Sequence, residues 1–134
     1  MALKKIVFTN GCFDILHVGH VRYLEEAKFM GDTLVVGLNS DLSFKKVKGY
    51  KPYMPQDERC EMLEALWMVD QVIIFDEETP LELIKEIKPD ILVKGSDHDP
   101  ETVVGREYAG EVRCIDVGAD VHTTDIIKRI LESK

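Results

Sequence analysis

The 134-residue sequence predicts an α/β fold built on one doubly wound parallel sheet, and three observations support this prediction. Short runs of β-branched and aliphatic residues recur along the chain, and they are almost continuously hydrophobic, as in strands covered on both faces. Segments with apolar residues at helical spacing separate these runs. No internal repeat or low-complexity segment interrupts the alternation, so we expect one domain over residues 1–134.

Five hydrophobic runs are expected to form the strands, namely residues 5–9, 34–38, 72–75, 91–93 and 112–115. Because strands joined through helices form right-handed parallel units, we expect a five-stranded Rossmann-like sheet with the order 3-2-1-4-5. Ligands bind to such sheets beyond the carboxyl ends of the strands. The polar segments that follow strand ends, where a site is expected, are residues 9–20, 39–51 and 94–99.

Four segments have apolar residues at helical spacing: Val21, Leu24, Ala27; Met62, Leu63, Leu66, Trp67; Leu83, Ile84, Ile87; and Ile126, Ile127, Ile130, Leu131. Pro55 can open the second helix, because its missing N–H would be unpaired there. Thr79, Pro80 and Glu82 are expected as N-cap, first helical position and capping-box partner of the third helix. Residues 41–52, which are rich in lysine, are expected to form a mobile loop.

Composition and charge narrow the class of protein. With 45% hydrophobic and 31% charged residues, the chain is an ordinary globular protein. It has no long apolar run and begins without a signal peptide, so we expect a cytoplasmic protein that does not bind a membrane. Its three cysteines are widely spaced, which disfavours a disulfide framework or a zinc knuckle. The net charge of −8 argues against binding nucleic acid.

One basic cluster stands out in this acidic chain, formed by Lys45, Lys46, Lys48 and Lys51. A solvated surface is the ordinary interpretation of such a cluster. Phosphate binding is the alternative, because the cluster follows a strand end.

Residues 9–20, TNGCFDILHVGH, leave the first strand and enter the first helix. Gly11 can let the backbone approach a ligand closely, and the free N–H groups of a helix start favour an anion. His17 and His20 are three residues apart, so they can point the same way from the first helical turn. Gly19 between them leaves room for a phosphate, and we interpret the segment as a phosphate site.

Three other interpretations of this segment were weighed. A lone histidine is usually a packed or surface residue, although two around a glycine at a strand end are less easily explained so. The histidines could bind zinc, but a tetrahedral site would need His98, His122 or an acidic residue as well. A dinucleotide redox site is poorly supported, because the segment is not G-x-G-x-x-G.

The motifs GCFD (residues 11–14) and HVGH (residues 17–20) resemble the HxGH signature of the cytidylyltransferase-like nucleotidyltransferases. The resemblance runs from Lys5 to Ile130. Within this superfamily the sequence is most similar to the adenylyltransferase branch of ADP-heptose synthases, and glycerol-3-phosphate cytidylyltransferases are more distant. The segments that favour the heptose branch are TNGCFD (9–14), NSD (39–41), KG (48–49), DER (57–59) and VKGSD (93–97).

The resemblance implies roles for individual residues. The catalytic residues it implies are His17, His20, Lys46 and Arg59. The nucleotide-binding residues it implies are Thr9, Asn10, Gly11, Cys12, Phe13, Asp14, Gly19, Lys94, Gly95, Asp97, Thr123 and Thr124. The acceptor phosphate is expected to meet Lys46 and Lys48.

The resemblance also implies a reaction, in which a nucleotidyl group passes from ATP or CTP to a phosphorylated small molecule such as heptose 1-phosphate. The acceptor phosphate is already anionic, so in-line attack and release of pyrophosphate need positioning and charge stabilisation rather than a general base. Mg²⁺ is the expected cofactor, held by nucleotide oxygens and water. Asp14 or Asp97 is the candidate to hold it through water, and a structural role is the alternative for both. No protein metal site is expected. Cys12 has no evident base, so we interpret it as a packing residue.

Two departures from the family pattern favour ATP over CTP. His122 replaces a serine before the paired threonines, and residues 117–121 lack the arginine of the cytidylyltransferases. Three alternatives remain: a glycerol-3-phosphate cytidylyltransferase, an enzyme like the archaeal FAD synthetases, and a nucleotide sensor without turnover. The first two differ from the main prediction in substrates, and the third differs in class.

A homodimer is expected, since a symmetric pair is the commonest assembly of soluble chains. Trp67 and Met68 are expected to end the helix that starts at Pro55, beside an edge strand, where a second copy could cover them. The alternative is that Trp67 packs its own helix on the sheet.

Overall fold

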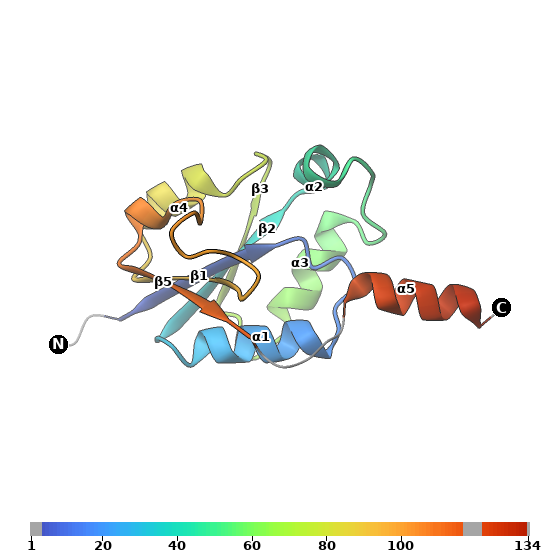
Figure 1. Ribbon diagram of the computed structural model, residues 1–134, viewed down its shortest axis with the longest axis horizontal. Helices are drawn as coiled ribbons and strands as arrows, with labels where there is room; N and C mark the ends of the chain where they lie inside the picture. The colour runs from blue at the N-terminus through green and yellow to red at the C-terminus, as the bar shows by residue number, and fades with distance from the viewer. Residues whose placement is uncertain (1–3, 117–121, 134) are drawn as a thin grey trace.

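The computed structural model describes residues 4–116 and 122–133 (Figure 1). The strands are β1 (Ile6–Gly11), β2 (Thr33–Asn39), β3 (Gln71–Phe75), β4 (Ile91–Gly95) and β5 (Glu111–Ile115). The helices are α1 (Val18–Lys28), α2 (Asp41–Lys48), α3 (Gln56–Glu64), α4 (Leu81–Ile87), the 3₁₀ helix η1 (Arg106–Tyr108) and α5 (Thr123–Glu132).

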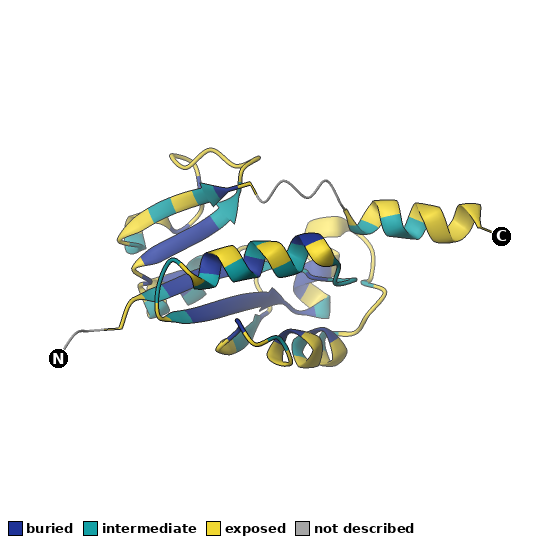
Figure 2. Cartoon of the chain, turned by 90° about the horizontal axis from the view of Figure 1, so that it is seen from below, coloured by how far each residue is buried: buried dark blue, intermediate teal, exposed yellow. Residues whose placement is uncertain are grey.

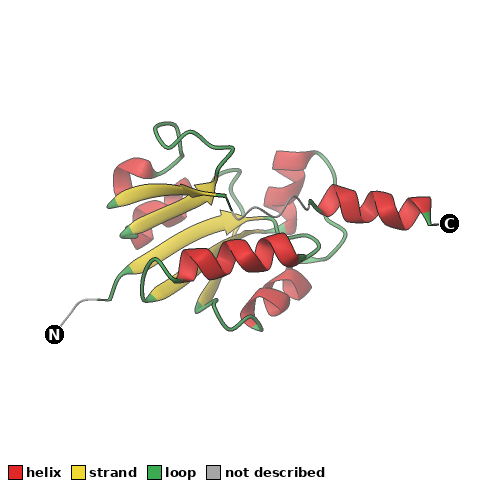
Figure 3. Ribbon diagram, turned by 60° about the horizontal axis from the view of Figure 1, so that its bottom comes forward, coloured by secondary structure: helices red, strands yellow, loops and turns green. Residues whose placement is uncertain are grey.

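The five strands form one parallel sheet in the order β3-β2-β1-β4-β5, which confirms the predicted topology (Figure 3). Successive residues of β1 serve opposite faces, as the pleat requires. Val7 packs with Leu24 of α1 and Leu63 of α3, whereas Phe8 packs with Ile84 of α4. The carboxyl end of β1, which leads to His17, therefore lies at the centre of a sheet that is covered on both sides.

The lysine-rich segment contradicts the prediction of a mobile loop, because residues 41–48 form helix α2. The side chain of Ser40 caps the helix by accepting a hydrogen bond from the N–H of Ser43 at 3.0 Å. Gly49 ends it in the left-handed conformation, with φ of 85°. Phe44 is buried and holds the helix against the body. Capping signals therefore outweighed the basic composition on which the loop prediction rested.

The end of α3 also differs from the prediction. The helix stops at Glu64, and Met68 is only 1% exposed in the core. Trp67, in contrast, is 62% exposed and lies near Phe29, with ring centroids 5.9 Å apart. A charge at Met68 would therefore disrupt the core rather than test a dimer surface. The homodimer stays a prediction, and Trp67 with Phe29 is the apolar surface on which it now depends.

Helix α4 begins one residue later than predicted. Pro80, expected at the first helical position, occupies the N-cap position, and no capping side chain bonds there. Thr79 instead accepts a weak 3.4 Å bond from the N–H of Leu81.

Helix α5 extends away from the sheet, and none of its residues is buried (Figures 1 and 2). Its first residue is tied to the segment after β1, because the hydroxyl of Thr123 donates to the carbonyl of Ile15 at 3.2 Å. In the part of the chain that the structure describes, no helix has the length and apolar character needed to cross a membrane.

Candidate functional site

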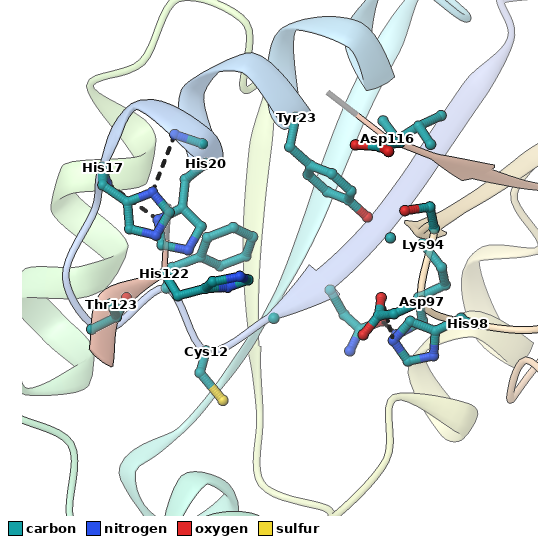
Figure 4. Close-up of a pocket in the computed structure, with 17 residues that line it drawn as sticks. Cys12, His17, His20, Tyr23, Lys94, Asp97, His98, Asp116, His122 and Thr123 are labelled. Atoms are coloured by element: carbon teal, nitrogen blue, oxygen red, sulfur yellow. Dashed lines mark hydrogen bonds and ion pairs between the residues drawn. The ribbon is translucent and has the colours of Figure 1, made fainter. Parts of the chain in front are cut away.

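Two adjoining cavities lie beyond the carboxyl ends of β1 and β4. The first, called the histidine cavity, has a volume of about 550 Å³ (Figure 4). Residues that line this cavity and not the second include His17, Tyr23, Asp97, Asp116 and His122. The second, called the tyrosine cavity, has a volume of about 480 Å³, and residues that line it and not the first include Lys48, Tyr50, Tyr53, Glu78 and Thr124. The residues that line both are Asn10, Gly11, Cys12, Phe13, His20, Lys94, His98 and Thr123. Most of the predicted nucleotide-binding residues therefore converge on one place.

The two signature histidines are fixed by the main chain of α1. His17 is the N-cap residue, and its Nδ1 accepts from the N–H of Gly19 at 3.1 Å. The Nδ1 of His20 accepts in turn from the N–H of His17 at 3.3 Å, and the two rings stack with centroids 3.8 Å apart. Because both Nδ1 atoms accept, the proton of each neutral ring sits on Nε2. Each imidazole can therefore donate one Nε2–H to a ligand.

Both histidines are neutral near pH 7. Burial lowers the pKa of His20 to about 4, and the neighbouring His17 contributes to this shift. Burial also lowers the pKa of His17, with a contribution from His122. The ligand-free site therefore offers neutral hydrogen-bond donors, and a bound polyphosphate would favour their protonation.

Gly11 packs against a ring of its own loop as well as lining both cavities. A Cβ built there would lie 2.9 Å from the ring of Phe13, so the absence of a side chain lets that ring pack against the main chain. Phe13 itself has φ of 46°, a left-handed conformation that is costly for a bulky residue. Its ring meets His20 edge-on, with centroids 5.2 Å apart. The left-handed turn at Phe13 therefore places its ring against His20.

Lys94 lies at the wall that the two cavities share. Its Nζ donates to Oδ1 of Asn10 at 2.6 Å, and burial lowers the pKa of its ammonium group. Asp97 and His98 follow on the same loop, and Oδ1 of Asp97 lies 3.8 Å from Nε2 of His98 (Figure 4). A Cβ at Gly95 would come within 2.8 Å of Oδ1 of Asp97, so glycine lets that carboxylate lie close to the main chain.

Thr9 does not reach either cavity. It is wholly buried, and its hydroxyl bonds to the carbonyl of Val93 at 3.0 Å and to the hydroxyl of Tyr23 at 2.7 Å. Tyr23, which does line the histidine cavity, has a pKa raised to about 12 by burial. Thr9 therefore supports the site through Tyr23 and makes no direct contact with a ligand in this arrangement.

Arg59 is buried in the protein, and its side chain is 0% exposed. Its Nη1 donates to the carbonyls of Cys12 and Asn39, each at 2.8 Å. Its Nη2 donates to Asp41 at 2.9 Å, and its Nε donates to the carbonyl of Met54, also at 2.9 Å. The guanidinium thus joins the loop after β1, the end of β2 and the segments at both ends of residues 41–54. These hydrogen bonds hold the segments together, and we call this structural role of Arg59 the brace. The catalytic role of Arg59 stays a prediction.

Asp14 is likewise engaged within the protein. Its two carboxylate oxygens accept the backbone N–H groups of Tyr53 and Met54 at 3.0 and 2.8 Å. Of the histidine and tyrosine cavities, it lines the tyrosine cavity.

Helix α2 separates the two predicted phosphate-binding lysines. Lys48 lines the tyrosine cavity, whereas Lys46 points to the carbonyl of Asp76 at 3.4 Å and lines neither cavity. At the start of α5, Thr123 lines both cavities and Thr124 lines the tyrosine cavity. The predicted contribution of residues 117–121 lies outside the described residues.

The partly buried thiol of Cys12 fits the packing role predicted for it. Burial raises the pKa of Cys12, with opposing contributions from Lys48 and Arg59, so the thiol stays protonated near pH 7. A nucleophilic role would require the thiolate.

Sequence reasoning missed several lining residues: Tyr23, Ser96, Ile115 and Asp116 in the histidine cavity, and Phe44, Val47, Tyr50, Tyr53, Glu78 and Ile127 in the tyrosine cavity. Tyr50 and Tyr53 lie in the segment that had been noted only for its lysines. Two aromatic residues among basic ones beyond a strand end were a signal that could have drawn attention to them.

Comparisons with known proteins identify the family of this chain. The chain matches the family described as cytidylyltransferase-like over residues 8–129. It is 54% identical over 134 residues to the bifunctional protein HldE of Syntrophotalea carbinolica, and 58% identical over 132 residues to that of Campylobacter concisus. These alignments cover 96% and 98% of this chain but only 27% and 28% of the two relatives.

A solved structure has the same fold. The lipopolysaccharide core biosynthesis protein of Thermoplasma volcanium superposes with a TM-score of 0.65 at 28% identity, covering 96% of this chain and 88% of that one.

The fold and the site define a nucleotidyltransferase. The chain belongs to the cytidylyltransferase-like family, and its similarity to HldE proteins confirms the resemblance predicted from the sequence.

Proposed function

We propose that this chain transfers the adenylyl group of ATP to the phosphate of a sugar phosphate, heptose 1-phosphate in particular, in lipopolysaccharide biosynthesis. The observation that carries the proposal is the pair of adjoining cavities with His20 and Lys94 at their shared wall. The histidine cavity would hold the nucleotide and the tyrosine cavity would hold the acceptor, so the α-phosphorus would lie where the two cavities meet. The likeness to HldE proteins and to a lipopolysaccharide core biosynthesis protein supports the choice of substrate.

The proposed reaction is an in-line displacement. An oxygen of the acceptor phosphate forms a bond to the α-phosphorus, the bond from phosphorus to the bridging oxygen breaks, and pyrophosphate leaves with that electron pair. The attacking oxygen is anionic at neutral pH, so no proton has to be removed. The Nε2–H groups of His17 and His20 and the ammonium of Lys94 would stabilise charge on the phosphoryl oxygens in the transition state.

Mg²⁺ fits this site as an ion carried by the nucleotide. Within the described residues no three metal-ligating side chains cluster, and both oxygens of Asp14 accept backbone N–H groups. The carboxylate of Asp97, which is 87% exposed, would hold such an ion through water. The ion would neutralise charge on the triphosphate and on the leaving pyrophosphate.

A pyrophosphate-release assay tests the proposal. ATP and heptose 1-phosphate with Mg²⁺ should give pyrophosphate and a nucleotide sugar in equal amounts, and calorimetry should show tighter binding of ATP than of CTP. Faster turnover of CTP with glycerol 3-phosphate would move the chain to the cytidylyltransferase alternative. Binding of ATP without release of pyrophosphate from it, whichever phosphorylated acceptor is added, would favour the nucleotide sensor.

A further inference from the structure

The tyrosine cavity has one wall that the proposed chemistry does not use. Tyr50 and Tyr53 follow α2, and Glu78 follows β3 on the other side of α2. The tyrosines are 52% and 63% exposed, so their rings present apolar surface to the cavity and to solvent. Exposed aromatic rings at the rim of a polar cavity are a common means of binding an amphipathic ligand.

The segment that carries these tyrosines is fixed to the rest of the site. Asp14 accepts the backbone N–H of Tyr53 at 3.0 Å, which ties the segment to the loop after β1. The ring of Tyr50 meets the buried ring of Phe44 edge-on, with centroids 5.7 Å apart. The guanidinium of Arg59 covers Phe44 at 5.7 Å from its centroid. The ring of Tyr50 is therefore held in place before any ligand arrives, and the main chain that carries Tyr53 is fixed.

The polar groups around this platform complete a recognisable pattern. Lys48 supplies a positive charge in the same cavity, and Glu78 supplies a carboxylate that can accept hydrogen bonds from hydroxyl groups. A sugar phosphate offers matching features: an anionic phosphate, a ring face made of C–H groups and a set of hydroxyl donors. A short acyclic phosphate such as glycerol 3-phosphate lacks the ring face.

We propose that the tyrosine cavity recognises a pyranose phosphate, with Tyr50 and Tyr53 against the C–H face of the ring, Glu78 accepting from its hydroxyls and Lys48 beside its phosphate. This inference rests on the proposed function in one respect, namely that the acceptor is the substrate that enters the tyrosine cavity. It makes Tyr50, Tyr53 and Glu78 specificity residues, and none of them takes part in the chemical step.

A binding experiment tests the inference without requiring turnover. Heptose 1-phosphate is titrated by calorimetry into protein saturated with Mg²⁺ and a non-hydrolysable ATP analogue, for the wild type and for Tyr50→Ala, Tyr53→Ala and Glu78→Gln. Each variant should bind the sugar phosphate roughly fivefold or more weakly, since aromatic and hydrogen-bonding contacts of this kind contribute about 1 kcal/mol each. Affinities for the ATP analogue and for glycerol 3-phosphate should not change.

The matched control is Trp67→Ala, which removes an exposed aromatic ring that lines neither cavity. It should bind heptose 1-phosphate as the wild type does, and melting curves should show that every variant is folded. The inference is overturned if wild-type protein does not bind heptose 1-phosphate, if the three variants bind it normally, or if they lose glycerol 3-phosphate equally. Sugar-phosphate binding without pyrophosphate release would keep this inference and overturn the proposed function.

Discussion

The two cavities share a wall, yet they are built in different ways. In the histidine cavity, the Nδ1 atoms of His17 and His20 accept the N–H groups of Gly19 and His17, so the main chain of one turn of α1 fixes both rings. In the tyrosine cavity, the rim depends on contacts between distant segments: Asp14 holds Tyr53, and Arg59 holds the carbonyl of Cys12. The first half of the site is a local structure, and the second half requires the fold to be complete. Substitutions should therefore affect the two halves differently.

The largest effect is expected from the histidine pair. His17→Ala or His20→Ala should lower kcat by about 10²-fold or more, because each removes an Nε2–H that donates to transition-state charge. His17→Ala also removes the N-cap of α1, which costs roughly 1 kcal/mol of stability. Steady-state kinetics and thermal melting measure the two effects separately.

The control for this prediction is His17→Ser, which can cap α1 but has no imidazole. It should melt close to the wild type and still lose about 10²-fold in kcat. If His17→Ser is fully active, the histidine serves only as a cap and the local half of the site carries no catalysis.

The next largest effect is expected on the free energy of unfolding when Arg59, the brace, is replaced. Arg59→Met should lower the free energy of unfolding by about 2–3 kcal/mol, because it leaves buried carbonyls and Asp41 without their donor. The matched control is Arg113→Met on β5, where an exposed ion pair with Glu111 is lost at a cost of about 0–0.5 kcal/mol. Urea unfolding compares the two variants. Equal stability would show that Arg59 does not hold these segments together and would leave the predicted catalytic role as its explanation.

The same contrast explains what the sequence could predict. The sheet and its strand order were predictable because buried parallel strands are continuous hydrophobic runs and their connections have a fixed hand. The histidine pair was predictable because the spacing of His17 and His20 is itself the geometry of one helical turn.

Other features depended on local signals that had been overlooked. Helix α2 has a capping serine at Ser40 and a terminating Gly49, and these two residues predict a helix even though the segment between them is rich in lysine. Met68 shows the limit of helical spacing, since the chain leaves the helix before Met68 and buries it in the core.

The long-range half of the site could not be predicted from spacing. Arg59 and Asp14 are polar residues whose partners lie up to 47 residues away in sequence. Family resemblance assigned both to the ligand, whereas only the assembled fold shows the carbonyl and N–H groups that they bind.

A smaller effect should separate the two lysines that the sequence grouped together. Lys48→Ala should raise the KM for the acceptor by about tenfold, the value of one charge-assisted hydrogen bond. Lys46→Ala should change it little, because Lys46 lies beside Asp76 and outside both cavities. Initial rates at saturating ATP give both KM values. An equal rise of the KM for the acceptor in the two variants would mean that α2 rearranges when substrates bind.

The last effect depends on pH, and it isolates the local half of the site. The pKa of His20 is about 4 in the folded protein and near its ordinary value of 6.5 in the unfolded chain. Between these values the unfolded chain binds more protons, so this residue's contribution to stability is complete above pH 6.5 and declines as the pH falls toward 4. His20→Gln is the matched variant, since glutamine can accept the same capping-box hydrogen bond and does not titrate. Urea unfolding of both proteins across this pH range should show the wild type losing more stability than the variant as the pH falls. Parallel curves would mean that His20 titrates normally, and that the stacked, main-chain-bonded arrangement of the two rings is not maintained in solution.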